Sequence, residues 1–294
     1  MINKDQIITV VDSKPLEFEN IKSYFQNNFS LSVKKFKILS EVAGDFFVDS
    51  ITVKQTQELK KYLFSQKLDC CVQSEQKRDK KILLSDMDAT IIENETLDDL
   101  VKISGVKANI DETSRLAMEG KIDIRTTLSV RVNYLKNKSK KLIDKVLEGI
   151  KFHPGSKTLI STLNSYKYIT CLITGGFAPI STFVGNKLGF QNIVSNEFKF
   201  HGDLFTGEYI PITGEKNSKL NYLNKITQET NIGIDKVVAI GDGANDLGML
   251  ENSGLGIGYH AHEIIKNKIS TQIYFNDLTA VLYYLGFCKK DFKS

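Results

Sequence analysis

Cysteines are few in this sequence, and their spacing argues against a cysteine-bound metal site and against a disulfide-stabilised fold. The chain has 294 residues and four cysteines, which are Cys70, Cys71, Cys171 and Cys288. Two of them are adjacent and all lie on or near apolar segments, so they form neither a metal-ligand spacing nor a disulfide framework. A reducing cytoplasm is the simplest interpretation of this pattern.

The sequence also lacks a long apolar run and a cluster of like charges. No apolar stretch approaches the ~20 residues of a membrane-spanning helix, and the stretch near the amino terminus is too short for a signal peptide. The net charge is +4, with lysines spread along the chain. We therefore expect neither a membrane nor a nucleic acid as a partner.

Apolar content is ordinary, and the chain is long enough for one large domain or two smaller ones. Hydrophobic residues make up 41% and charged residues 25%, as is typical of globular proteins. Up to residue 79, strands are predicted at 7–11, 33–39, 46–53 and 70–72, and helices at 16–29 and 56–64. The order β-α-β-β-α-β is typical of a ferredoxin-like α+β domain. A polar linker at 74–80 separates this predicted domain, residues 1–79, from the rest.

Residues 80–294 carry the pattern of an α/β domain. Strands are predicted at 81–85, 168–174, 236–240, 255–259 and 272–275, with helical patterns between most of them. This alternation predicts a parallel sheet covered by helices. The helical stretch at about 97–152 is longer than a crossover needs, so we expect an inserted helical subdomain there. The segment at 197–209 predicts a hairpin on the edge of the sheet.

Acidic residues follow two of the predicted strands. Asp86 and Asp88 come directly after the first strand of the α/β domain, and a turn with Asp242, Asn245 and Asp246 follows the strand at 236–240. Open α/β sheets bind ligands at the carboxyl ends of their strands, so we expect these side chains to share one edge. Their oxygens suit Mg²⁺, held by few protein ligands together with a substrate phosphate.

Groups that can bind phosphoryl oxygens come from two other predicted turns. Thr174, Gly175 and Gly176 offer a hydroxyl and exposed N–H groups, and Lys219 lies at the start of a helix near the same edge. A phosphate dianion that faces several carboxylates needs such donors and a divalent metal. Each pattern alone has an ordinary explanation, because an isolated Asp-x-Asp is usually a solvated turn and a lone lysine a solvated helix residue. Their occurrence together and in this order favours phosphoryl-transfer chemistry.

Taken together, these segments resemble the four motifs of the haloacid dehalogenase (HAD) superfamily of phosphatases. The motifs stand at 86–90 (DMDAT), 174–176 (TGG), Lys219 and 241–246 (GDGAND). The similarity is closer to the phosphoserine phosphatase family, in segments 86–99, 117–120, 129–132, 153–155, 174–177, 241–246 and 254–257. The resemblance covers about 81–287 and implies a Rossmann-like, HAD-like parallel sheet core with an inserted helical cap. Residues 1–79 resemble ACT-type regulatory domains in topology only.

The resemblance implies Mg²⁺-dependent hydrolysis of O-phospho-L-serine, the final step of L-serine biosynthesis, through an aspartyl-phosphate. It makes Asp86 the nucleophile and Asp88 the general acid and base. Mg²⁺ would bind Asp86, Asp242 and the backbone carbonyl of Asp88. The phosphoryl oxygens would be held by Thr174, Gly175 and Lys219, with support from Asn245 and Asp246.

The same resemblance assigns the residues that recognise the substrate. Glu95 would bind its ammonium and Arg131 its carboxylate, where a bidentate guanidinium is better suited than a lysine. Met118 and Phe177 would line the apolar side of the closed site. The ordinary alternatives are a helix N-terminal charge for Glu95 and a surface cation for Arg131.

Two departures from the family pattern and two other functions stay open. Thr174 stands where the family usually has serine, and Ala89 replaces a common serine, but neither change removes a catalytic group. The nearest alternative is a related HAD phosphatase or phosphotransferase that acts on another small phosphomonoester, such as phosphohomoserine. The second alternative is an amino-acid-sensing or scaffold protein whose α/β core has no catalytic activity. Whether residues 1–79 bind a regulatory amino acid or only form a homodimer stays open, as does the preference for Mg²⁺ or Mn²⁺.

Overall fold

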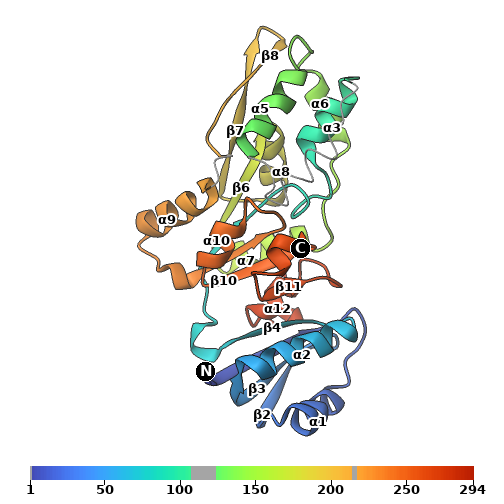
Figure 1. The fold of residues 1–294 in the computed structure, drawn as a ribbon, viewed down its shortest axis with the longest axis vertical. Coiled ribbons are helices and arrows are strands. Elements are labelled where there is room, and N and C mark those ends of the chain that lie inside the picture. The colour runs from blue at the N-terminus through green and yellow to red at the C-terminus, as the bar shows by residue number, and fades with distance from the viewer. Residues whose placement is uncertain (1, 107–123, 214–216) are drawn as a thin grey trace. The chain divides into compact units, whose positions relative to one another are not determined.

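The computed structural model of the chain describes residues 2–106, 124–213 and 217–294 (Figure 1). The chain divides into two compact units. The first unit contains residues 1–80, 154–166 and 271–294, and the second contains residues 81–153 and 167–270. Compactness does not test which segments fold independently, so the domain boundaries 1–79 and 80–294 stay a prediction. None of the described helices is long and apolar enough to cross a membrane.

The first unit begins with the β-α-β-β-α-β order that the sequence predicts. Its elements are β1 (Ile2–Val11), α1 (Phe18–Phe29), β2 (Val33–Ser40), β3 (Ala43–Thr52), α2 (Val53–Ser65), β4 (Asp69–Ser74) and η1 (Glu75–Lys77). Later segments add α7 (Ser156–Ser165), β11 (Thr271–Ile273), α12 (Ala280–Tyr284) and η3 (Lys289–Asp291). The strands pair antiparallel in the order β2-β3-β1-β4-β11. The strand predicted at 272–275 therefore forms, but it pairs antiparallel with β4, Gln272 opposite Cys70.

One apolar core holds the two helices of the first unit against its sheet. Ile8 and Phe46 on the strands and Phe25 and Leu59 on the helices are fully buried members of this core. The helix α2 begins at a capping box. The Thr52 hydroxyl accepts from the backbone N–H of Gln55, and the side-chain oxygen of Gln55 accepts from the backbone N–H of Thr52. The apolar packing and the capping box therefore both stabilise the arrangement of helices on one face of the sheet.

The second unit has the α/β architecture predicted from the sequence. Its strands are β5 (Ile82–Ser85), β6 (Ile169–Ala178), β7 (Asn192–His201), β8 (Leu204–Ile210), β9 (Val237–Gly241) and β10 (Leu255–Tyr259). They lie in the order β10-β9-β5-β6-β7-β8, and all neighbours are parallel except β7 and β8. The pair β7–β8 is the predicted edge hairpin. The central strand β5 is buried along its whole length, which explains its uninterrupted apolar sequence.

Helices cover this sheet and build a cap. The helices around the sheet are α8 (Ile180–Leu188), α9 (Ser218–Thr230), α10 (Leu247–Asn252) and α11 (Glu263–Lys266), and η2 (Ile234–Lys236) precedes β9. The cap consists of α3 (Thr96–Ile103), α5 (Ile124–Tyr134) and α6 (Leu142–Glu148), which gather beside β7 and β8 (Figure 1). Leu100, Val132 and Phe177 belong to one buried cluster between cap and sheet. The predicted segment 117–120, with Met118, lies outside the described residues.

We expect the Arg78–Asp45 pair to stabilise the first unit strongly. The Arg78 guanidinium donates to both Asp45 oxygens, at 2.6 and 2.8 Å, and the Asp45 side chain is fully buried. Arg78→Met leaves that charge without its partner, and we expect urea unfolding to show a loss of about 3–5 kcal/mol. Lys34→Ala, which removes the exposed Lys34–Asp49 pair, is the control and should change the unfolding free energy little. Equal effects of the two substitutions would contradict this assignment.

Candidate active site

Two of the predicted acidic turns meet at the carboxyl end of β5. The backbone N–H of Asp86 continues the ladder and donates to Ile240 of the neighbouring β9 (3.0 Å). After Asp88, Ala89 adopts a left-handed conformation with φ 52°, which turns the chain back. The Thr90 hydroxyl then donates to Asp242 at 3.2 Å, so the turn after β5 is bonded to the turn after β9.

Lys219 links the carboxylates of both turns. Its ammonium lies 2.6 Å from Asp86 Oδ1 and 2.5 Å from Asp246 Oδ1, and all three side chains are buried. The other oxygen of Asp246 accepts from the backbone N–H groups of Asp242 and Gly243. Burial alone would lower the pKa of Lys219, but Asp246 and Asp86 raise it above its ordinary value. Lys219 is therefore charged and holds the nucleophile candidate in place.

The described residues include one cluster of carboxylates that could hold a metal ion. One oxygen each from Asp86, Asp242 and Asp246 lies within 4.8 Å of the others. Burial raises the pKa of Asp242 to about 7, and burial and the charge of Asp246 raise the pKa of Asp86 well above its usual value. Among the described residues, no group donates to the buried Asn245 Oδ1 beside them. An excess of buried oxygen donors over cations fits a divalent cation.

The predicted metal set and the observed cluster share Asp86 and Asp242. Asp88 was predicted to bind metal through its backbone carbonyl, and its side chain lies outside the carboxylate cluster. Both oxygens of Asp246 are occupied by Lys219 and by backbone N–H groups. Asp246 therefore holds Lys219 and the turn, in addition to adding negative charge.

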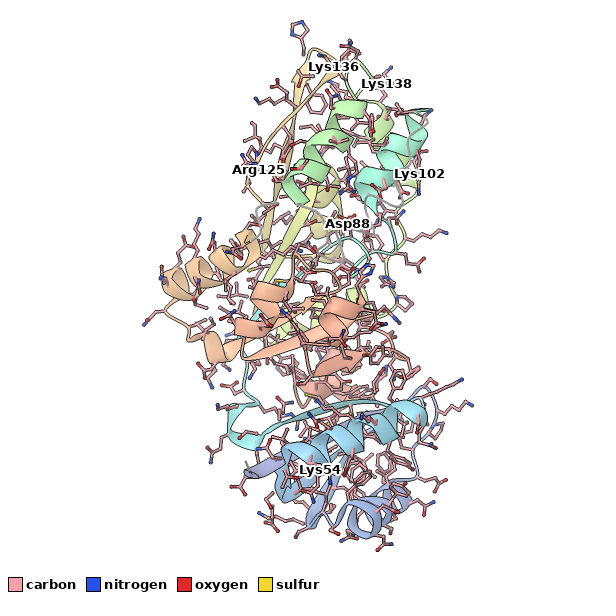
Figure 2. All side chains as sticks on the ribbon, viewed as in Figure 1. Lys54, Asp88, Lys102, Arg125, Lys136 and Lys138 are labelled. Carbon is pink, nitrogen blue, oxygen red and sulfur yellow. The ribbon has the colours of Figure 1, made fainter. Side chains whose placement is uncertain are left out.

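Asp88 is held separately, between the sheet and the cap (Figure 2). Its Oδ1 accepts from the backbone N–H of Thr96, at the start of α3 (2.9 Å), and its Oδ2 accepts from the Thr174 hydroxyl (3.4 Å). Burial raises the pKa of Asp88, and the Thr96 N–H opposes this shift. A carboxyl with a raised pKa, held in a fixed direction, suits proton transfer.

An irregular stretch within β6, which contains Thr174, Gly175 and Gly176, faces this acid. The backbone N–H of Gly176 donates to the Thr174 hydroxyl at 2.8 Å, which sets the direction of that side chain. A Cβ at position 176 would lie 3.0 Å from Asp88 Oδ2, so glycine allows the turn to approach the acid closely.

A small cavity gathers most of the predicted site residues. Its volume is about 30 Å³. It is lined by Asp86, Asp88, Glu95, Leu97, Leu128, Arg131, Thr174, Gly175, Gly176 and Asn245. Lys219 and Asp242 are not in its lining, but both contact the acids described above. The structure thus places the predicted phosphoryl-binding and recognition residues around one space.

Arg131 has a partner that sequence reasoning missed. Its Nη1 donates to Asp98 Oδ1 at 2.8 Å, and both side chains are almost fully buried. Asp98 lies in the first turn of α3. From the sequence alone, its charge is therefore explained by a favourable interaction with the helix dipole. Burial and the nearby Asp88 carboxylate raise the pKa of Glu95 well above its ordinary value. A cation beside Glu95 would stabilise the charged form of its carboxyl.

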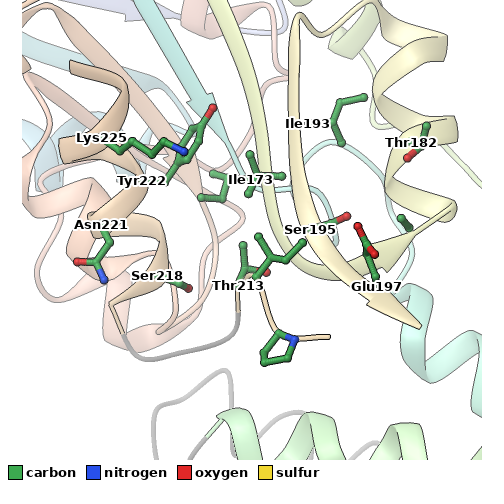
Figure 3. A pocket seen from close by; sticks show the side chains of 14 residues that line it. Ile173, Thr182, Ile193, Ser195, Glu197, Thr213, Ser218, Asn221, Tyr222 and Lys225 are labelled. Atoms are coloured by element: carbon green, nitrogen blue, oxygen red, sulfur yellow. The ribbon is translucent and has the colours of Figure 1, made fainter. Parts of the chain in front are cut away.

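A larger cavity, of about 780 Å³, lies elsewhere in the second unit (Figure 3). Side chains of β6, β7 and α9 surround it, among them Ile173, Ser195, Tyr222 and Lys225. None of the carboxylates of the acidic cluster lines it. Size alone therefore does not locate the chemistry, and the small polar cavity is the candidate active site.

The match to a family model agrees with this geometry. Residues 83–251 match the model of the haloacid dehalogenase-like hydrolases. The chain belongs to this family of α/β hydrolases.

Relatives and solved structures extend the similarity over most of the chain. A phosphoserine phosphatase of Vibrio cholerae is 28% identical over 274 residues, covering 92% of this chain and 82% of the relative. A solved phospho-aspartyl intermediate analogue of phosphoserine phosphatase is 31% identical with a TM-score of 0.67, covering 70% of this chain and 99% of the other. A HAD family hydrolase from Salmonella enterica serovar Typhi shares the fold, with a TM-score of 0.86, 22% identity, and 97% and 99% of the two chains covered.

The raised pKa of Asp242 predicts how the metal-free protein responds to pH. A carboxyl whose pKa is about 7 when folded and about 4 when unfolded stabilises the fold fully below pH ~4 and loses that contribution as pH rises through ~7. In EDTA, the unfolding free energy of Asp242→Asn minus that of the unsubstituted protein should therefore increase from pH 5 to pH 8. Urea unfolding at the two pH values measures it. The exposed Glu251→Gln is the control, and a constant difference for Asp242→Asn would contradict the expectation.

Proposed function

We propose that the protein hydrolyses O-phospho-L-serine to L-serine and phosphate through an aspartyl-phosphate at Asp86. One observation carries the proposal. A single cavity has Asp86, Asp88, Thr174 and Gly175 among its walls, and also Glu95 and Arg131. The first group suits a phosphoryl group, and the second suits the ammonium and carboxylate of an amino acid.

In the first step, a carboxylate oxygen of Asp86 attacks phosphorus, and the bond from phosphorus to the serine oxygen breaks. The leaving oxygen takes the proton of Asp88, whose pKa is raised by burial so that it can carry one. In the second step, Asp88 accepts a proton from water as the water oxygen attacks phosphorus. The bond to Asp86 then breaks and phosphate leaves.

Lys219 has two tasks in this scheme. It holds Asp86 through its 2.6 Å contact, and its positive charge attracts the phosphoryl oxygens when they arrive. Thr174 and Gly175 add a hydroxyl and an N–H for the same oxygens. Preorganised donors of this kind stabilise charge that develops in the transition state.

We infer that Mg²⁺ is the cofactor, held by Asp86, Asp242 and the backbone carbonyl of Asp88, with Asn245 close by. The support is the cluster of buried carboxylates with raised pKa values. When bound, the ion screens the charge between these acids and the phosphoryl oxygens. Asp246 and Lys219 keep the turn after β9 in position without it.

Recognition of the serine part falls to Glu95 and Arg131. Asp98 accepts from Nη1 of the guanidinium and the Thr127 carbonyl accepts from Nε, and these contacts fix the orientation of the planar cation that would attract the substrate carboxylate. Burial and nearby acids raise the pKa of Glu95 and so disfavour its charged form, and a substrate ammonium beside it would stabilise that form. The two ends of the amino acid are thus read by opposite charges.

The cavity also implies motion of the cap. A volume of about 30 Å³ is about a tenth of that of a small ligand pocket, ~300 Å³. The substrate-free cavity is therefore too small for phosphoserine, and we propose that α3 or α5 moves outward before the substrate binds. Closure over the substrate would then exclude bulk water.

Location and assembly belong to the proposal as well. The four cysteines are free thiols in the structure, which supports a cytoplasmic location. We propose the ACT-like assignment of residues 1–79 on their element order, with a homodimer as the assembly to test. The nearest competing function remains hydrolysis of another small phosphomonoester, and a panel of phosphoamino acids separates the two.

Replacing the nucleophile should abolish turnover. We expect Asp86→Asn to lower kcat for phosphoserine by about a thousandfold or more, because an amide cannot form the phosphoenzyme. Steady-state assays and a search for burst phosphate release measure this. Asp144→Asn removes an exposed acid of the cap and should leave kcat unchanged. A phosphate burst from the Asp86→Asn protein would contradict the assignment.

Neutralising Glu95 should affect only substrates with an ammonium. We expect Glu95→Gln to raise KM for phosphoserine by about ten- to a hundredfold and to leave the KM for p-nitrophenyl phosphate within about twofold. Glu93→Gln, which changes an exposed acid two residues away, is the matched control. Equal KM changes for the two substrates would overturn the recognition role of Glu95.

A further inference from the structure

Asn196 and Thr213, which the sequence analysis did not select, bond to the backbone of residues 174–176, the segment proposed to bind the phosphoryl group. The strand β6 pairs with β7 as far as Ile173 and again from Phe177, so residues 174–176 leave the ladder. Side chains bond to the carbonyls of Thr174 and Gly175 instead. The Thr213 hydroxyl donates to the Thr174 carbonyl at 2.5 Å, and Asn196 Nδ2 donates to the Gly175 carbonyl at 2.9 Å.

Asn196 is itself fixed by the chain that leads to Lys219. Its Oδ1 accepts from the backbone N–H groups of Ile212 and Thr213, each at 2.9 Å. Asn196 and Thr213 are almost completely buried, so these bonds do not compete with water. The side-chain amide of Asn196 therefore joins β7, the irregular stretch within β6 and the segment before α9.

Each bonded carbonyl shares a rigid peptide group with the N–H of the next residue. The bond to the carbonyl therefore also fixes the direction of that N–H. In a planar trans peptide, the C=O and N–H groups point in opposite directions. Thr213, by holding the Thr174 carbonyl, sets the direction of the N–H of Gly175, and Gly175 is one of the residues that line the small cavity. Asn196, by holding the Gly175 carbonyl, sets the N–H of Gly176, which donates to the Thr174 hydroxyl. That hydroxyl in turn donates to Asp88.

We propose that Asn196 and Thr213 are positioning residues for phosphoryl transfer, which fix the Gly175 N–H and the Thr174 hydroxyl without touching the substrate. The inference rests on the proposed function in one respect, namely that this turn binds the phosphoryl group. It does not depend on the identity of the leaving group. Any phosphomonoester that the protein hydrolyses can therefore report it.

Thr213→Val and Asn196→Asp test the proposal with nearly isosteric changes. The first removes the donor to Thr174, and the second replaces the donor to Gly175 with an acceptor. We expect kcat to fall by about ten- to a hundredfold for both phosphoserine and p-nitrophenyl phosphate. The inhibition constant of inorganic phosphate should rise by a similar factor. Thr213→Ser keeps the hydroxyl and should restore kcat to within about threefold of the unsubstituted protein.

Ser195→Ala is the matched control. Ser195 is adjacent to Asn196 on β7, is buried, and bonds to the Ser181 hydroxyl at 2.7 Å. Like Thr213, it lines the larger cavity (Figure 3). We expect this variant to melt at a lower temperature than the unsubstituted protein and to keep its kcat.

Two results would overturn the inference. One is a folded Thr213→Val or Asn196→Asp protein, by thermal melt, whose kcat and phosphate inhibition are unchanged. The other is an equal loss of kcat in Ser195→Ala, which would show a general response to lost buried hydrogen bonds. Failure of the unsubstituted protein to hydrolyse phosphoserine would count against the proposed substrate only, because the aryl phosphate series still measures the effect of both positions.

Discussion

The contact of one ammonium with two buried carboxylates is the interaction on which the candidate site depends. Lys219 lies between Asp86 and Asp246, and Asp246 holds the turn that carries Asp242. Removal of the cation would leave several negative charges together in a medium that cannot screen them. The sheet brings strand ends together, but this charge balance keeps the acids there. The metal proposed for the site would complete the balance that the lysine begins.

The sequence predicts those parts of the protein whose physical signal is local. The apolar strand before Asp86, the alternation of strands and helices, and the hairpin at 197–209 all appear in the structure. Asp98, Asn196 and Thr213 could not be found in this way, because each acts on a residue distant along the chain. The strand near 272 was predicted, but its partner β4 depends on a pairing across some two hundred residues. Local propensity does not contain that information.

The first unit shows how a terminal segment can belong to a distant part of the sequence. Arg78 donates to the carbonyl of Tyr283 as well as to Asp45. Asp69 accepts from three consecutive backbone N–H groups, at residues 274–276. Buried, hydrogen-bonded carboxylates of this kind fix one arrangement of the chain, since few other partners could satisfy them. The carboxyl-terminal residues are therefore part of the framework of the ferredoxin-like layer.

The small volume of the catalytic cavity has a consequence for the order of events. The substrate-free cavity has a volume of about 30 Å³, about a tenth of that of a small ligand pocket, ~300 Å³. In the proposed reaction, a cap that opens only as far as phosphoserine requires would leave no room for a second nucleophile until serine departs. Bound serine would then shield the proposed phosphoenzyme from water. On this view, transfer of the phosphoryl group to an alcohol and its hydrolysis differ only in which molecule fills the vacated space first.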